Sequence, residues 1–81
     1  MPIILRIGPY RFEFYASDMD EPPHIHVRRG RLKAKFWLIP KVEIARNQRF
    51  AAHELNKIER LVVLNRQHFV EQWHEYFDTG R

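Results

Sequence analysis

Residues 24–38 read HIHVRRGRLKAKFWL and alternate between polar and apolar side chains on both sides of Gly30. An alternation with a period of two is typical of a β-strand that buries one of its faces. We therefore expect strands at residues 24–29 and 32–38, joined by a tight turn at Arg29-Gly30-Arg31. The outward face of this hairpin would carry six polar or aromatic side chains, those of His24, His26, Arg28, Lys33, Lys35 and Trp37.

The flanking segments extend this hairpin into a larger sheet. Residues 3–7 predict a short first strand, and residues 10–16 predict a second strand whose aromatic side chains share one face. An acidic loop over residues 17–23 follows and ends in two prolines, which cannot donate hydrogen bonds within a sheet. Residues 42–46 predict a last short strand, so the sheet would be antiparallel with four to five strands within residues 3–46.

The period of the apolar residues changes from 2 to 3.6 after about residue 52, as in amphipathic helices. One apolar stripe ends before Asn65 and another begins after it, so we expect two helices with a break there; a single kinked helix is the alternative. Gly80 would cap the end of the helical region. The predicted fold class is therefore α+β, a two-layer domain in which two C-terminal helices, at about residues 52–79, pack on one face of the sheet.

Length and composition indicate one small folded unit. A chain of 81 residues is too short to form two domains with separate cores, so residues 1–81 are expected to be a single domain. The absence of cysteine excludes disulfides and thiolate metal sites and favours a cytoplasmic location. No apolar run reaches the roughly 20 residues that span a bilayer. The N-terminal residues 1–5 resemble a strand more than a signal peptide, so we expect no membrane association.

The net charge of +4 is high for so short a chain and favours a polyanionic partner, either nucleic acid or an acidic protein. The alternative is that the charge only keeps the protein soluble. If the helices cover one face of the sheet, the other face would hold cations, imidazoles and two aromatic rings. RNA is therefore a candidate ligand, because cations bind phosphates and aromatic rings stack on bases.

A metal-independent ribonuclease is the first enzymatic hypothesis. Such an enzyme needs a general base, a general acid and cations for the phosphate. His24 and His26 could be the base and the acid, because alternate residues of a strand place their side chains roughly 6.5–7 Å apart on one face. Arg28 and Lys35 would hold the phosphate. Tyr15 and Trp37 would stack on bases.

Two other interpretations of the histidines remain open. His24 and His26 could bind a metal ion together with Glu21, or with Asp18 or Asp20. Alternatively, both histidines could be structural, with hydrogen bonds to the backbone. The sequence contains no Gly-rich phosphate loop or Walker-type motif, so we expect no bound cofactor and find no support for nucleotide hydrolysis.

The run Glu21-Pro22-Pro23-His24-Ile25-His26-Val27 resembles the core of a bacterial family of unknown function with a Pro-Pro-His-x-His motif. The resemblance covers nearly the whole chain and extends to Tyr10-x-Phe12-x-Phe14-Tyr15, to residues 34–38 and to Trp73. Members of this family are short and are often encoded beside a second small protein, and such pairs have been interpreted as toxin–antitoxin modules. The resemblance implies a small protein partner encoded nearby, but no established activity.

Two functions from different classes follow. The chain could be the toxin-like member of such a pair and act on RNA through the sheet face that bears His24 and His26. The alternative is a non-catalytic module that binds a partner or regulates it, in which the histidines are structural and an exposed sheet edge serves for docking. A homo-oligomer is also compatible with so small a domain.

Overall fold

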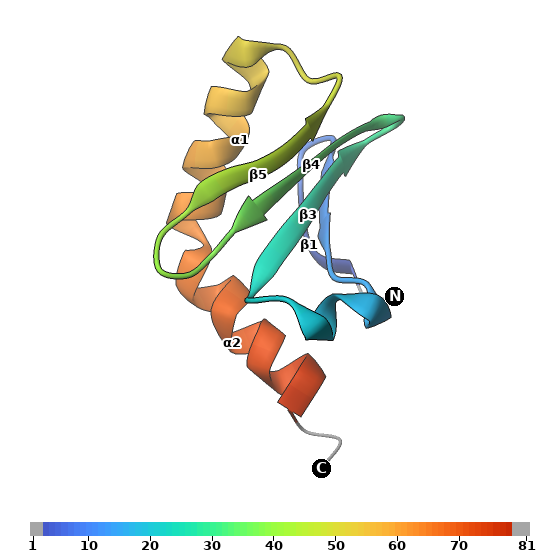
Figure 1. The fold of residues 1–81 in the computed structure, drawn as a ribbon. Coiled ribbons are helices and arrows are strands. Elements are labelled where there is room, and N and C mark those ends of the chain that lie inside the picture. Colours follow the sequence, from blue (N-terminus) through green and yellow to red (C-terminus); the bar gives the residue numbers. More distant parts are fainter. Residues whose placement is uncertain (1–2, 79–81) are drawn as a thin grey trace.

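The computed structural model describes residues 3–78 of the chain (Figure 1). Five strands and a short 3-10 helix precede two α-helices. In chain order these elements are β1 Ile3–Ile7, β2 Tyr10–Glu13, η1 Ala16–Asp20, β3 His24–Arg29, β4 Leu32–Trp37, β5 Glu43–Gln48, α1 Ala52–Leu64 and α2 Arg66–Asp78. The predicted α+β class, with an antiparallel sheet followed by two C-terminal helices, is confirmed.

The five strands form one sheet in sequence order, and each strand is antiparallel to the next. The β3–β4 hairpin turns at Gly30, whose φ of +60° is a conformation that glycine adopts without steric cost. The register places residues of one face in rows across the sheet. One row is Glu13–His26–Lys35–Arg46, and the next is Arg11–Arg28–Lys33–Gln48.

The two helices cover the opposite face of the sheet, where the core lies (Figure 1). Ile58 and Val62 of α1 and Phe69 and Trp73 of α2 are buried. The apolar face of each helix therefore packs against the sheet, as the 3.6-residue period predicts. The ring of Phe69 stacks on that of Phe12 from β2, with centroids 5.3 Å apart. The second face of the sheet is covered by neither α1 nor α2 and is the open face.

The helical region is broken at Asn65, as the change of phase between the apolar stripes predicts. The Asn65 side-chain amide donates to the carbonyl oxygen of Leu61 at 2.8 Å, and this hydrogen bond closes the end of α1. The backbone carbonyl of Asn65 accepts a hydrogen bond from the amide of Phe69, the first such bond of α2. Arg66 then donates from Nε to the carbonyl oxygen of Leu38 at 2.6 Å. This bond ties the break to the end of β4. The expected helix end at residue 79 and the Gly80 cap lie outside the described residues.

Two strand ends differ from the prediction by more than one residue. β2 ends at Glu13 instead of residue 16, because the backbone amide of Tyr15 donates to Asp18 and the chain turns into η1. β5 runs to Gln48 instead of ending at residue 46, and all six of its residues are exposed. The Asn47 side chain stops the strand by accepting from the amide of Phe50 and donating to its carbonyl, both at 3.0 Å.

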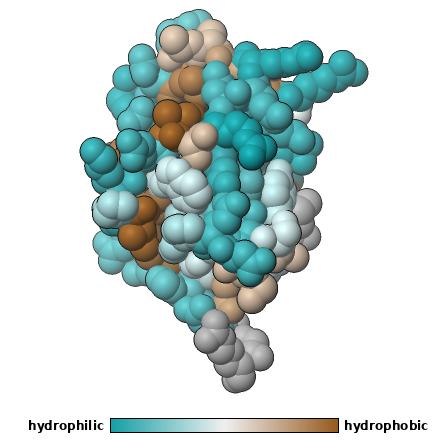
Figure 2. All heavy atoms as spheres, viewed as in Figure 1, coloured by the Kyte–Doolittle hydropathy of each residue, from teal (hydrophilic) through white to brown (hydrophobic). Residues whose placement is uncertain are grey.

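Within residues 3–78, no helix combines the length and the apolar character needed to cross a membrane. Figure 2 shows hydrophilic side chains over much of the surface in the view of Figure 1, with small apolar groups beside α1 and beside the turn between β4 and β5.

Glu54 ties the start of α1 to the sheet. Its carboxylate accepts two hydrogen bonds from Arg29, from Nε at 2.7 Å and from Nη2 at 2.9 Å, and one from the hydroxyl of Tyr10 at 2.7 Å. A planar guanidinium and a carboxylate match in this two-bond arrangement. The Arg29 guanidinium, assisted by the Tyr10 hydroxyl, holds the pKa of Glu54 below its ordinary value of 4.5.

We expect Glu54→Gln to lower the urea midpoint of unfolding at pH 7. A carboxyl whose pKa is lower in the folded state stabilises the fold above its ordinary pKa, and this stabilisation is lost as the pH falls through the folded value. The difference between wild type and Glu54→Gln should therefore shrink as the pH is lowered below about 4.5. Urea unfolding followed by circular dichroism at several pH values measures both effects.

Glu59→Gln is the matched control, because Glu59 lies exposed on the same helix and makes no ion pair among residues 3–78. It should leave the midpoint nearly unchanged. An equal loss in both variants would contradict the role assigned to Glu54.

Candidate functional site

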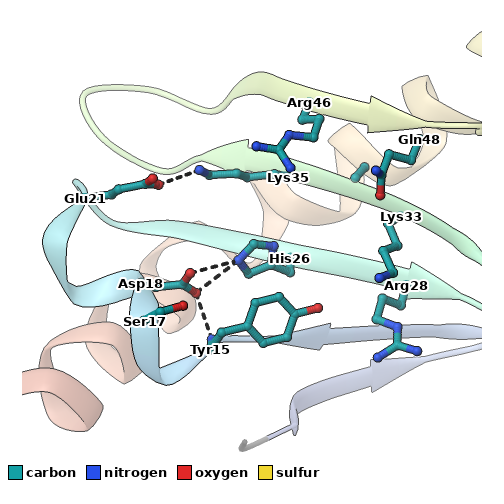
Figure 3. A pocket seen from close by; sticks show the side chains of 11 residues that line it. Tyr15, Ser17, Asp18, Glu21, His26, Arg28, Lys33, Lys35, Arg46 and Gln48 are labelled. Carbon is teal, nitrogen blue, oxygen red and sulfur yellow. Dashed lines mark hydrogen bonds and ion pairs between the residues drawn. The ribbon is translucent and has the colours of Figure 1, made fainter.

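A pocket of about 360 Å3 opens on the open face of the sheet (Figure 3). Its walls come from β3, β4 and β5 and from the segment between β2 and β3. Four cations line it, namely Arg28, Lys33, Lys35 and Arg46. The other lining residues are Tyr15, Ser17, Asp18, Glu21, His26, Ala34 and Gln48.

Two of the four cations are held by carboxylates. Lys35 donates to Glu21, and Arg28 lies 3.4 Å from Glu13 between Nη1 and Oε2. Lys33 and Arg46 are exposed, and neither forms an ion pair with any residue that the structure describes. The pocket therefore offers at least two cations to an anionic ligand without breaking an existing ion pair.

Aromatic rings lie beside these charges. The Tyr15 ring stacks on the His26 imidazole with centroids 4.1 Å apart, and the Tyr15 hydroxyl donates to Glu13 at 3.0 Å. Burial, followed by the hydrogen bond to Glu13, raises the pKa of Tyr15 above its ordinary value. Trp37 is not part of the pocket lining but lies next to it, with Nζ of Lys35 4.7 Å from the centre of its ring.

Asp18 is the central carboxylate of the site (Figure 3). It accepts the backbone amide of Tyr15 at 2.8 Å, and its two oxygens lie 3.0 and 3.2 Å from Nε2 of His26. Burial would raise the pKa of Asp18, but the Tyr15 amide and the neighbouring histidines outweigh burial, and the pKa is lowered. Burial lowers the pKa of His26 against the opposing effect of Asp18, which favours a neutral imidazole near pH 7.

His24 is fully buried, so the expectation that it lies exposed on the open face is wrong. The loop before β3 covers it, because its Nδ1 lies 2.9 Å from the carbonyl oxygen of Pro22. Trp73 of α2 packs against its ring with centroids 5.0 Å apart. Of the two imidazoles in the hypothetical acid–base pair, only that of His26 lines the pocket.

The carboxylate beside both histidines is Asp18, whereas the sequence favoured Glu21. Asp18 Oδ1 lies 3.2 Å from Nε2 of His24, and the rings of His24 and His26 are 5.0 Å apart. Donor atoms of Asp18, His24 and His26 all lie within 4.8 Å of one another. Glu21 is half exposed and pairs with Lys35, and its Oε1 is 3.7 Å from Nδ1 of His24.

The remaining sequence candidates are placed as follows. Tyr15, Arg28 and Lys35 line the pocket together with His26, as expected from the strand alternation. Two lining residues were not expected from the sequence. Arg46 lies within the expected strand 42–46 but was not named as a site residue, and Gln48 lies beyond the end of that strand. The register places them opposite Lys35 and Lys33 on the open face.

The family described as a domain of unknown function, DUF4160, matches residues 10–74. The chain belongs to this family. The resemblance to a family of unknown function is thereby confirmed, and the DUF4160 match includes every residue that lines the pocket.

Neither a curated protein nor a solved structure matches the chain. The small protein partner, the RNA ligand and the cytoplasmic location therefore stay predictions for this DUF4160 protein.

We expect Tyr15→Phe to lower the free energy of unfolding by about 1–3 kcal/mol, the usual cost of depriving a buried charged group of a hydrogen bond. The buried carboxylate of Glu13 loses the Tyr15 hydroxyl in this variant, while the ring can still stack on His26. Urea unfolding at pH 7 in EDTA measures the change.

Tyr76→Phe removes the same atom from a ring of α2 that is 40% exposed. Its hydroxyl makes no hydrogen bond within residues 3–78, so the change should be within about 0.5 kcal/mol of zero. A Tyr15→Phe effect no larger than that of Tyr76→Phe would show that the Glu13 contact does not stabilise the fold.

Proposed function

We propose that this protein binds single-stranded RNA on the open face of its sheet and acts as the toxin-like member of a gene pair. The observation that carries the RNA proposal is the cross-strand row Arg11–Arg28–Lys33, which places three cations side by side on β2, β3 and β4. Like charges directly opposite each other destabilise a sheet. An arrangement that disfavours folding by itself is expected where an anionic ligand compensates for it.

The neighbouring row supplies two more cations on the same face, Lys35 and Arg46. Since Lys33 and Arg46 have no carboxylate partner among the described residues, a phosphate can approach them at little cost in broken ion pairs. Binding to phosphates by such cations releases counterions and supplies most of the affinity of a sequence-independent binder. Two adjacent rows of cations suit a chain of phosphates better than one isolated phosphate.

A single strand fits this face better than a duplex because aromatic rings flank the cations. Tyr15 and His26 lie stacked inside the pocket, and Trp37 lies beside Lys35. Stacking of a base on such a ring requires the base to be unpaired. Among residues 3–78, His26 is the only histidine that lines the pocket, so we propose RNA binding and not cleavage by two histidines.

Lys33→Gln combined with Arg46→Gln should weaken binding of a fluorescein-labelled single-stranded RNA of about 12 nucleotides at least tenfold in 50 mM salt. Loss of two phosphate contacts should also reduce the slope of log K against log salt by roughly 1.4, or 0.7 for each contact. Fluorescence anisotropy titrations at several salt concentrations measure both quantities.

Lys57→Gln combined with Arg60→Gln removes the same charge from α1, away from the pocket. This control should bind RNA nearly as well as wild type. If both double variants weaken binding equally, the attraction depends on net charge alone and the open face is not the binding surface.

The toxin-like role predicts that induced expression of the wild-type chain slows bacterial growth. The Lys33→Gln/Arg46→Gln variant should restore growth, because it would no longer hold RNA, and the Lys57→Gln/Arg60→Gln variant should not. Growth curves with immunoblots for equal protein levels provide the measurement. Normal growth at high levels of wild-type protein would contradict toxicity. It would not contradict RNA binding, which the anisotropy titrations test separately.

A further inference from the structure

We propose that Asp18, His24 and His26 bind a divalent transition metal ion, with Zn2+ as the lead candidate. The site lies where the loop before β3 meets the start of that strand. This inference goes beyond RNA binding and does not depend on it, because it stands on the placement of three donor groups.

The donor atoms are close enough to share one ion. The Asp18 carboxylate lies 3.2 Å from Nε2 of His24 and 3.0 Å from Nε2 of His26. Ligand bonds of about 2.0–2.1 Å in a tetrahedral zinc site separate neighbouring donor atoms by about 3.3 Å. The spacing of Asp18 to each histidine is therefore close to that of a zinc site, and all three donors lie within 4.8 Å of one another.

The hydrogen bonding of His24 is a second, independent observation that favours a metal ion. Its Nδ1 lies 2.9 Å from the carbonyl oxygen of Pro22, and a carbonyl can only accept, so Nδ1 carries the proton. The Nε2 atom of His24 is then the ring nitrogen that is left to bind another group. This atom is fully buried and has no hydrogen-bond partner among the described residues, although a carboxylate oxygen lies 3.2 Å away.

A cation between Nε2 of His24 and this carboxylate oxygen would be bound by both. A buried polar atom without a partner costs free energy, and native proteins contain few of them. A metal ion would accept both electron pairs and remove this cost.

The surroundings also match those of metal ligands. A histidine that binds a metal usually donates its other ring N–H to a backbone carbonyl or a carboxylate, as His24 does to Pro22. The Asp18 carboxylate is fixed in turn by the Tyr15 backbone amide. Both outer contacts orient the donors before any ion arrives.

The site would be open on one side. Asp18 and His26 line the pocket, whereas His24 is buried beneath them. Three protein ligands leave at least one position of a tetrahedral ion for water or another ligand, as in catalytic zinc sites. That position would face the pocket and its cations.

The donor set indicates the class of ion. Two imidazoles and one carboxylate suit Zn2+, Fe2+, Ni2+ and related ions, while Mg2+ and Ca2+ prefer oxygen ligands.

Tag-free protein should be stripped with EDTA, exchanged into chelator-free buffer and titrated with Zn2+ by isothermal titration calorimetry. We expect one ion per chain and a rise in the melting temperature on addition of Zn2+, because an ion that binds the folded state stabilises it.

Asp18→Asn and His26→Gln should each weaken Zn2+ binding by at least about 100-fold and abolish the rise in melting temperature, since even outer contacts of metal sites contribute 10–100-fold. Two variants at different positions keep the test decisive if one fails to fold, which circular dichroism checks. His74→Gln should bind as wild type, and it controls for chelation by the exposed His74–Asp78 pair.

Several results would overturn the proposal. These are absence of one-to-one binding by wild type, unchanged affinity in both Asp18→Asn and His26→Gln, and a loss in His74→Gln as large as in those variants. No RNA is present in these measurements, so they succeed or fail independently of the anisotropy result.

Discussion

The carboxylate of Asp18 holds the segment between β2 and β3 against the start of β3. It accepts the Tyr15 amide where the chain leaves β2, and it lies beside His24 and His26 where the chain enters β3. These contacts turn residues 16–20 back over the sheet as a single 3-10 helix. Without them the pocket would lack one wall and His24 would lose its cover. The candidate site therefore depends on the Asp18 side chain, and the free-energy cost of burying its carboxylate is offset by its hydrogen-bond and charged partners.

The division of the sheet into two faces explains why a site can exist in so small a chain. The rings of β2 and the apolar residues of β3 and β4 are covered by α1 and α2, and this packing provides the core. Because both helices lie on that side, the other face is free to hold charged and aromatic side chains. Glu13 and Arg28 neutralise part of this charge. Four cations, Arg28, Lys33, Lys35 and Arg46, therefore line one pocket on this face.

Sequence periodicity was sufficient for the parts of the structure that depend on local repeats. The strands of the β3–β4 hairpin and the helix break at Asn65 follow from the 2.0 and 3.6 periods. The positions of His26, Arg28 and Lys35 on the open face follow from the same rule. Arg46 and Gln48 were missed because β5 is exposed throughout and is offset by an irregularity between Lys35 and Phe36.

The burial of His24 and the central place of Asp18 could not be read from periodicity. His24 lies at an alternating position that is outward by the strand rule, and only Trp73, about 50 residues later, and the returning loop enclose it. The sequence showed several carboxylates before the two histidines, but a loop has no repeat that determines which one points inward. Tertiary contacts decided both outcomes.

The exposed strand β5 gives the two sides of the pocket different mechanical properties. The wall formed by residues 15–18 is fixed by hydrogen bonds to Asp18, whereas Arg46 and Gln48 lie on an edge strand that is paired on one side only. Edge strands with few buried contacts open locally at a lower free energy than central strands. The pocket therefore has a rigid side and a yielding side, and its width can adjust at β5 while the arrangement around Asp18 is preserved.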